Sequence, residues 1–140
     1  TSSPEAAHPT KEFSFFSLPE TLDGIKAIGI DYVALGNNHV YDFLEDGVND
    51  TLLEVDSAGL AHSGAGKNIA SAYQAKFMDV GTLTLGLFSA TSITGKEHAI
   101  TYVTDATKGG AADLTETELV SNYLNDAVQN SDYVSTQRLH

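Results

Sequence analysis

The chain has 140 residues, enough for one domain with a substantial core, because a domain of this size buries roughly two-thirds of the surface that its unfolded form exposes. Nineteen acidic residues against seven basic ones give a formal net charge of -12, which favours solubility and argues against nucleic acid and anionic lipid surfaces as partners. The absence of cysteine excludes disulfides, thiolate metal sites and cysteine nucleophiles.

Residues 1–12 are polar and contain two prolines, so we expect an extended lead-in in which His8 is solvated. The sequence from Ser17 to Glu20 has the spacing of a capping box and predicts a helix. Its apolar residues recur on one helical face, at Leu18, Leu22 and Ile25. Gly29 is the expected end of this helix, because glycine accepts the left-handed conformation that follows many helices.

A strand, a helix and a second strand are predicted next. The apolar run from Tyr32 to Leu35 is typical of a buried strand, and Gly36 ends it. A capping pattern from Asp42 to Glu45 opens a helix whose apolar face comprises Leu44, Val48, Leu52 and Val55. Leu60 to His62 is the next strand. This order indicates a βαβ crossover with its two strands side by side, and ligands bind at the carboxyl ends of such strands.

The hydrophobic period changes after Tyr73. Apolar residues alternate on both sides of Gly81-Thr82, which predicts a β-hairpin. The segment from Ser92 to Gly110 is less regular, with a short strand expected at Ile100–Val103 and a break at Gly109-Gly110. Thr115 to Glu118 is expected to cap a last helix with Val120, Leu124 and Ala127 on one face, followed by a strand beginning at Tyr133-Val134.

The segment Asn37-Asn38-His39 is the strongest candidate for chemistry. Two carboxamides and an imidazole follow the end of a buried strand, with Asp42 three residues further on. A carboxamide oxygen can bind a divalent cation, and an imidazole can protonate a leaving oxygen. The alternative is structural, because asparagine is common in tight turns and Asp42 would serve as a helix N-cap. The residues alone leave both interpretations open.

Other motifs give weaker signals. Gly64-Ala65-Gly66-Lys67 lacks the glycine and the hydroxyl residue of a phosphate-binding loop, so a turn is favoured. His62 is expected at a core edge or in solvent. Ser89, Thr91 and Ser92 have no histidine and aspartate at a recognisable spacing, which argues against a serine nucleophile.

The same segment carries a family resemblance. The run Ile28–Asp42 combines a Gly-Ile-Asp strand with Gly-Asn-Asn-His and a following Asp, and it continues through Gly47, Asp50-Thr51, Ala58–Leu60 and Gly64–Gly66. In this order and spacing, the stretch from Phe13 to Ala90 resembles the CapA/PgsA family of capsule and poly-gamma-glutamate synthesis proteins. Two departures are Phe43-Leu44, where the family usually has Tyr-Gly, and Gly36, where it usually has alanine.

That family is similar to the calcineurin-like metallophosphoesterases, and the likeness implies roles for individual residues. Asn38 would be a metal ligand, His39 the catalytic residue and Asn37 a substrate-binding neighbour. His140 would be a further metal ligand, as the first residue of a later family motif. The resemblance implies divalent metal ions as cofactors, in a pair of Mn, Zn or Fe. One asparagine with one or two histidines cannot hold such a pair, so the isolated chain is expected to bind metal poorly.

The resemblance implies an α/β fold, a partial layered sandwich of the metallophosphoesterase type with a βαβ unit, a β-hairpin and a C-terminal helix. Residues 1–140 would be one incomplete domain. The expected function is capsule or poly-gamma-glutamate synthesis or export, with a metal-dependent phosphoesterase-like or hydrolase site. A non-catalytic binding or scaffolding component and a small-ligand-binding domain are the alternatives. Expected partners are an anionic cell-surface polymer or its precursor, the export complex and the remainder of the domain, at an extracytoplasmic, cell-surface location.

Overall fold

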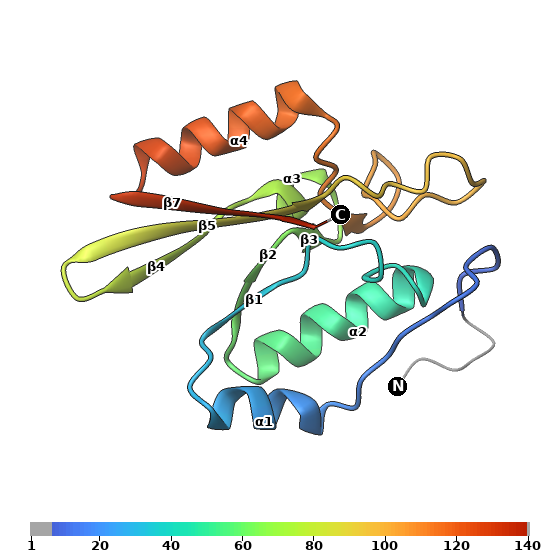
Figure 1. Cartoon of the computed structure of the whole chain (residues 1–140), viewed down its shortest axis with the longest axis horizontal. Helices are drawn as coiled ribbons and strands as arrows, with labels where there is room; N and C mark the ends of the chain where they lie inside the picture. The colour runs from blue at the N-terminus through green and yellow to red at the C-terminus, as the bar shows by residue number, and fades with distance from the viewer. Residues whose placement is uncertain (1–6, 140) are drawn as a thin grey trace.

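The computed structural model describes residues 7–139, which contain four helices and seven strands. In chain order they are α1 Glu20–Ala27, β1 Tyr32–Ala34, α2 Leu44–Ser57, β2 Ala61–Ser63, β3 Ala65–Gly66, α3 Ile69–Tyr73, β4 Lys76–Val80, β5 Leu83–Thr91, β6 Gly110–Ala111, α4 Thr117–Gln129 and β7 Tyr133–Leu139. Figure 1 shows α4 on one side of the strands and α1 and α2 on the other. This mixed α/β arrangement is compatible with a partial sandwich and confirms the expected fold class.

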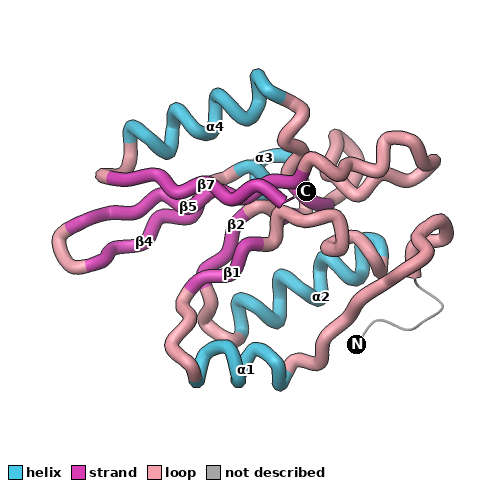
Figure 2. Tube along the Cα trace, in the orientation of Figure 1, coloured by secondary structure: helices cyan, strands magenta, loops and turns pink. Residues whose placement is uncertain are grey.

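The strands of the described region form three small sheets. The largest has the order β4-β5-β7, in which β5 pairs antiparallel with β4 and parallel with β7. β1 and β2 form a parallel pair, with Tyr32 opposite Ala61 and Ala34 opposite Ser63. β3 and β6 form a short antiparallel pair. Figure 2 shows the β1–β2 pair between the larger sheet and α2.

The predicted βαβ unit is present as β1, α2 and β2. The two strands are parallel neighbours, as expected for a crossover connection. α2 buries Val48, Leu52 and Val55, which confirms the helical face predicted from the period of apolar residues. Val48 and Leu52 pack in one cluster with Tyr41 and Tyr102. The loop that joins β1 to α2 therefore leads into a well-packed helix.

The predicted capping boxes are wrong. Among the described helices, no side-chain capping bond forms at the N-cap residues of α1, α2 and α4, which are Pro19, Phe43 and Glu116. Two of the expected capping side chains bond elsewhere: Asp42 contacts Lys11, and Thr115 donates to Asp113. A capping box is present at α3, where the Asn68 and Ser71 side chains bond each other's backbone N–H.

Gly36 lies at the end of β1, in close contact with β5. A Cβ at this position would lie 2.5 Å from Ala90 N and 2.5 Å from Ser89 Oγ, so no side chain fits without movement. Gly36 N donates to Ser89 Oγ at 3.0 Å. Gly64, after β2, has φ +92, and a Cβ there would lie 2.5 Å from Gly36 N. The ends of β1 and β2 therefore meet β5 at one point, which fixes the start of the 37–43 loop.

The N-terminal segment is not the solvated lead-in that the sequence predicts. His8 is only 3% exposed. Its Nε2 donates to Ile100 O at 3.1 Å, and its backbone N donates to Asp42 O at 2.7 Å. Because both groups have buried partners, the expectation of a solvated His8 is wrong. Residues 1–6 of the predicted lead-in lie outside the described residues.

The second half follows the prediction where the pattern is regular. β4 and β5 form the expected hairpin around Gly81, whose φ is +64. α4 buries Val120 and Ala127. β7 begins at Tyr133, as the short apolar pair there predicts, and the structure shows that it pairs in parallel with β5.

The segment between β5 and α4 departs from the prediction. Ile100–Val103 is not a strand, although Val103 forms an isolated parallel bridge with Ala111. Gly110 belongs to β6 rather than to a break in the chain, and its φ of +146 suits glycine. Ala65 and Gly66 lie in β3, where the sequence favoured a turn. These two-residue strands are too short to produce a hydrophobic period.

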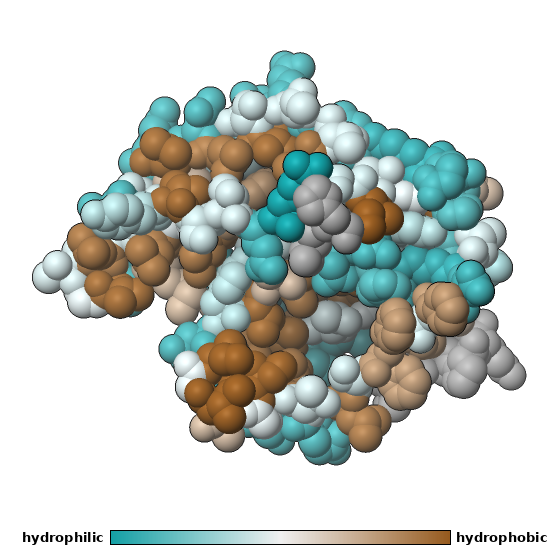
Figure 3. Space-filling view, in the orientation of Figure 1, coloured by the Kyte–Doolittle hydropathy of each residue, from teal (hydrophilic) through white to brown (hydrophobic). Residues whose placement is uncertain are grey.

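Apolar side chains also reach the surface. Figure 3 shows brown residues over α1 and over the β4–β5 hairpin. The large exposed hydrophobic residues include Phe13, Phe15, Phe16 and Leu18 before α1, Ile28 after it, and Val80 and Leu83 in the hairpin. Within the described region, every helix is too short or too polar to cross a membrane.

Candidate functional site

The loop after β1 folds as consecutive turns that carry the candidate residues. Asn37 Oδ1 accepts a hydrogen bond from His39 N at 2.9 Å, and Asp42 N donates to His39 O at 3.1 Å. The turn interpretation therefore applies to Asn37, whose side chain bonds its own backbone segment. The loop leaves the carboxyl end of β1, where α/β folds place ligand sites. Both interpretations of the motif are thus compatible with the same geometry.

Asp42 is the centre of a buried polar network. Its side chain is 1% exposed. His39 Nδ1 lies 2.9 Å from Oδ2, Phe15 N donates to Oδ2 at 2.7 Å, and Lys11 Nζ contacts Oδ1. Three donors satisfy a carboxylate that would otherwise be costly to bury. The network, and not helix capping, explains this aspartate.

Lys11 joins the N-terminal segment to the loop. Its side chain is 5% exposed, and Nζ donates to Asn38 O as well as to Asp42 Oδ1. The same ammonium lies 4.1 Å from the centroid of the Tyr102 ring. A buried ammonium is stable where a carboxylate and further polar groups surround it. Lys11 therefore holds the Asn38 carbonyl and the Asp42 carboxylate in fixed places.

The contacts of His39 determine which of its nitrogens carries a proton. Nδ1 lies within hydrogen-bond distance of both Asp42 carboxylate oxygens, at 2.9 and 3.2 Å. Because this carboxylate accepts from Lys11 and Phe15 as well, Nδ1 must be the donor. Nε2 is then the nitrogen that can exchange a proton with a ligand. The His39 side chain is 40% exposed, and its ring and that of Phe15 pack nearly perpendicular to each other, with 4.7 Å between centroids.

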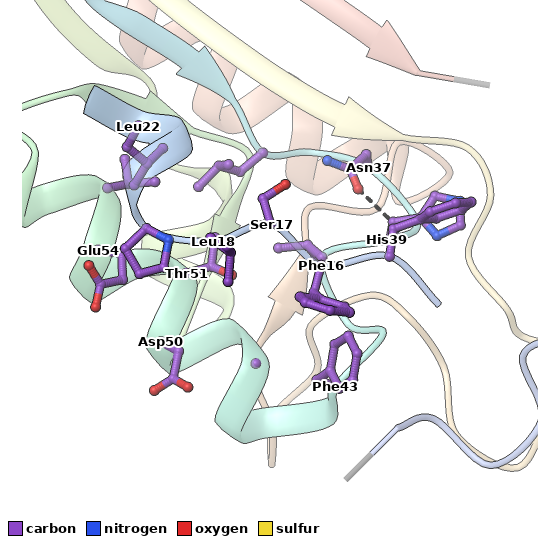
Figure 4. Close-up of a pocket in the computed structure, with 16 residues that line it drawn as sticks. Phe16, Ser17, Leu18, Leu22, Asn37, His39, Phe43, Asp50, Thr51 and Glu54 are labelled. Carbon is purple, nitrogen blue, oxygen red and sulfur yellow. Dashed lines mark hydrogen bonds between the residues drawn. The ribbon is translucent and has the colours of Figure 1, made fainter. Parts of the chain in front are cut away.

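His39 and Asn37 line an open cleft of about 330 Å³. Its walls come from the segment Phe15–Leu22 and from α2, and its lining is mostly apolar. Figure 4 shows His39 and Asn37 at one end, with Phe16 and Leu18 between them and Glu54. An apolar cleft with a few polar groups together is the usual form of a small-ligand site.

Burial shifts the pKa values of several groups around this network. It lowers the pKa of His8, and it lowers the pKa of Lys108, whose Nζ lies 4.1 Å from the centre of the Tyr41 ring. Burial, together with the nearby Glu45 carboxylate, raises the pKa of Tyr41 to about 12. At neutral pH His8 and Tyr41 are therefore uncharged.

The residues predicted for the site do not all lie together. His39 and Asn37 share the wall of the cleft. Asn38 is half-buried and does not line that cleft, while its carbonyl oxygen accepts from Lys11. His140 lies outside the described residues, so its metal role stays a prediction.

Sequence reasoning missed the residues that support the site from the N-terminal segment. Lys11 and Phe15 contact Asp42 across 31 and 27 positions of the chain. Nothing in the local pattern around either residue predicts a partner so far away. The aromatic residues between positions 13 and 16 were the one signal that this segment packs against the rest of the protein.

The described residues do not fit a pair of metal ions by themselves. Across residues 7–139, no three His, Asp or Glu side chains gather where they could hold one ion. Asp42, the nearest carboxylate to His39, is already bonded to Lys11 and Phe15. A dinuclear centre needs several imidazole and carboxylate ligands. Asn38 could be one ligand of such a centre only with others from outside these residues.

Comparison with known proteins identifies the relatives. A family model described as bacterial capsule synthesis protein PGA_cap matches residues 1–138. Two Sinorhizobium fredii proteins, named uncharacterized protein y4sH and uncharacterized protein y4uA, are each 33% identical to this chain over 84 residues. The matched region is 59% of this chain and 18% of each relative. The chain therefore spans under a fifth of the length of these relatives.

Proposed function

This chain belongs to the PGA_cap family of bacterial capsule synthesis proteins, and we propose that it helps to make or export an anionic cell-surface polymer by acting on a phosphate ester at His39. The observation that carries this proposal is the bond between His39 Nδ1 and the buried Asp42 carboxylate at 2.9 Å. It orients the imidazole so that Nε2 is the nitrogen free to act. The cleft supplies space for a substrate beside it.

The chemistry assigned to His39 is general acid catalysis of ester hydrolysis. A bond forms between water oxygen and phosphorus as that water releases a proton to solvent, and the bond from phosphorus to the leaving oxygen breaks. The leaving oxygen takes the proton of Nε2, while Nδ1–H stays bonded to Asp42. Asp42 stabilises the imidazolium form that exists before this transfer, and Lys11 keeps the carboxylate in place. Asn37 would bind the substrate beside His39, at the same end of the cleft.

Metal binding and partners are proposals about the whole protein. We propose that Asn38 is one ligand of a divalent ion whose other ligands come from outside the described residues. The substrate would be an anionic polymer or its precursor, and the other partners would be components of the synthesis and export complex. The proposed location is extracytoplasmic and associated with the cell surface.

The test is hydrolysis of bis-p-nitrophenyl phosphate and p-nitrophenyl phosphate by the full-length protein with Mn²⁺. The variant His39→Ala should lower kcat by about 10²- to 10⁴-fold, the usual contribution of a general acid. Asn38→Ala should raise the Mn²⁺ concentration needed for half-maximal activity. The matched controls are His98→Ala and Asn125→Ala, which lie outside the cleft and should leave turnover unchanged.

Two results would overturn the proposal. One is hydrolysis that His39→Ala leaves intact. The other is the absence of turnover with either ester at any metal concentration, together with retained binding of the polymer. That second result would favour a non-catalytic scaffold.

A further inference from the structure

The cleft beside His39 has polar groups at both ends and a mainly apolar middle, to which Ser17 and Thr51 add hydroxyls. Figure 4 shows Asn37 and His39 at one end, Phe16, Phe43 and Leu18 along the middle, and Glu54 at the far end. A site for a compact, fully polar substrate would be lined with donors and acceptors throughout. The apolar middle therefore indicates that part of the ligand is hydrocarbon.

The apolar wall is unusually exposed. Phe16 is 69% exposed and Leu18 is 55% exposed, although both line the cleft. The opposite side is well packed, with Phe43 9% and Val55 3% exposed. Exposed aromatic and aliphatic residues that face a groove beside polar groups are typical of ligand sites. Here they form a groove with one rigid side and one side open to solvent.

We propose that this groove binds the unbranched apolar chain of an amphiphilic phosphate ester, with the phosphate at His39. The inference rests on the proposed function, because it takes His39 as the group that meets the phosphate. A volume of about 330 Å³ holds roughly ten heavy atoms at about 30 Å³ each, which is the share of one water molecule in the liquid. A chain of about six carbons with its phosphate group is of this size.

Charge gives the ligand one orientation. Asp50 and Glu54 line the cleft away from His39, and their carboxylates repel a phosphate. The whole chain also carries a formal net charge of -12, so attraction between charges contributes little to holding an anion. Burial of the hydrocarbon chain supplies the affinity that this acidic surface does not.

The experiment measures binding of ethyl, butyl, hexyl and octyl phosphate, and of hexanol, to the full-length protein by isothermal titration calorimetry. Each methylene that enters the groove should tighten binding about fourfold, hence roughly 200-fold between ethyl and hexyl phosphate. Hexanol should bind more weakly than hexyl phosphate, because it lacks the group that meets His39. Equal affinity for ethyl and hexyl phosphate, or for hexanol and hexyl phosphate, would overturn the proposal.

Two variants test the groove itself. Phe16→Ser removes an exposed wall residue and should reduce the dependence on chain length to less than twofold per methylene. Phe13→Ser is the matched control, because Phe13 is 64% exposed and does not line the cleft. Gly47→Leu, which places a side chain from α2 in the cleft, should abolish the dependence. If Gly47→Leu fails to fold, Phe16→Ser decides alone: a dependence unchanged from Phe13→Ser contradicts the proposal.

Measurements of binding and of turnover test the groove and the hydrolytic function separately. Hydrolysis of short esters without any dependence on chain length would leave the proposed function standing and remove this inference. A clear dependence on chain length in a protein that hydrolyses nothing would support the groove and remove the hydrolytic function.

Discussion

Two lysine–aspartate pairs in this chain differ in how deeply they are buried, and that difference separates the candidate site from the structural scaffold. Lys11 and Asp42 have side chains that are 5% and 1% exposed. Lys96 and Asp113 have side chains that are 49% and 2% exposed, with 2.8 Å between Nζ and Oδ2. The two aspartates are equally buried, so the pairs differ in the lysine: Lys96 is half solvated, whereas Lys11 is shielded from water. A buried pair needs complete partners on both sides.

The two carboxylates also support different neighbours. Asp113 accepts from both the backbone N and the hydroxyl of Thr115 at 2.7 Å, just before α4. Asp42 accepts from an imidazole that lines a cleft. One aspartate therefore organises a helix start, and the other organises a group capable of proton transfer. The two aspartates therefore differ in role because they accept hydrogen bonds from different groups.

Removal of the buried lysine should have the larger effect on stability. Lys11→Met leaves the Asp42 carboxylate inside the protein without its cation, and such changes typically cost about 3–5 kcal/mol. Urea unfolding of the full-length protein, followed by circular dichroism, measures this loss.

The matched control is Lys96→Met. It removes a half-exposed ammonium from a buried carboxylate that keeps two hydrogen bonds from Thr115, and we expect a loss of about 1 kcal/mol or less. Equal losses in the two variants would show that burial does not distinguish the pairs.

The pH dependence of stability should sharpen the same comparison with a smaller effect. Burial lowers the pKa of His8 from its ordinary value of 6.5, so the unfolded chain takes up a proton before the folded one does. The stability from neutral His8 is complete above about pH 6.5 and falls as the pH drops, by at most about 1.4 kcal/mol per pH unit.

Hydrogen exchange can locate this acid sensitivity. Amides of the N-terminal segment and of the 37–43 loop should lose protection at pH 5.5 before those around Asp113. His8→Gln cannot titrate and should flatten the pH dependence. An unchanged slope in His8→Gln would assign the acid sensitivity to other groups.

The sequence predicts the parts of this fold that depend on local periodicity. Val48, Leu52 and Val55 repeat at helical spacing and are buried in α2, and the alternation around Gly81 became the β4–β5 hairpin. Period identifies a buried face because the same spacing sets the geometry of the element. The period does not show which other part of the chain packs against that face.

Contacts between distant positions could not be predicted in this way. His8 meets Ile100 across 92 positions, and Lys11 meets Asp42 across 31. The sequence placed Asn37 and His39 correctly at the end of a strand, where they line a cleft. It assigned Asp42 to helix capping, because a capping pattern and a buried network partner look the same when only neighbouring residues are considered.

Asp42 is expected to hold the His39 imidazole with Nε2 toward the cleft. Long-range ¹H–¹⁵N correlation NMR of the labelled full-length protein at mildly alkaline pH reports which ring nitrogen carries the proton. We expect the Nδ1–H tautomer for His39, and a mixture of tautomers in Asp42→Ala. A His39 ring protonated on Nε2 in the unmodified protein, or a tautomer that Asp42→Ala does not change, would contradict it.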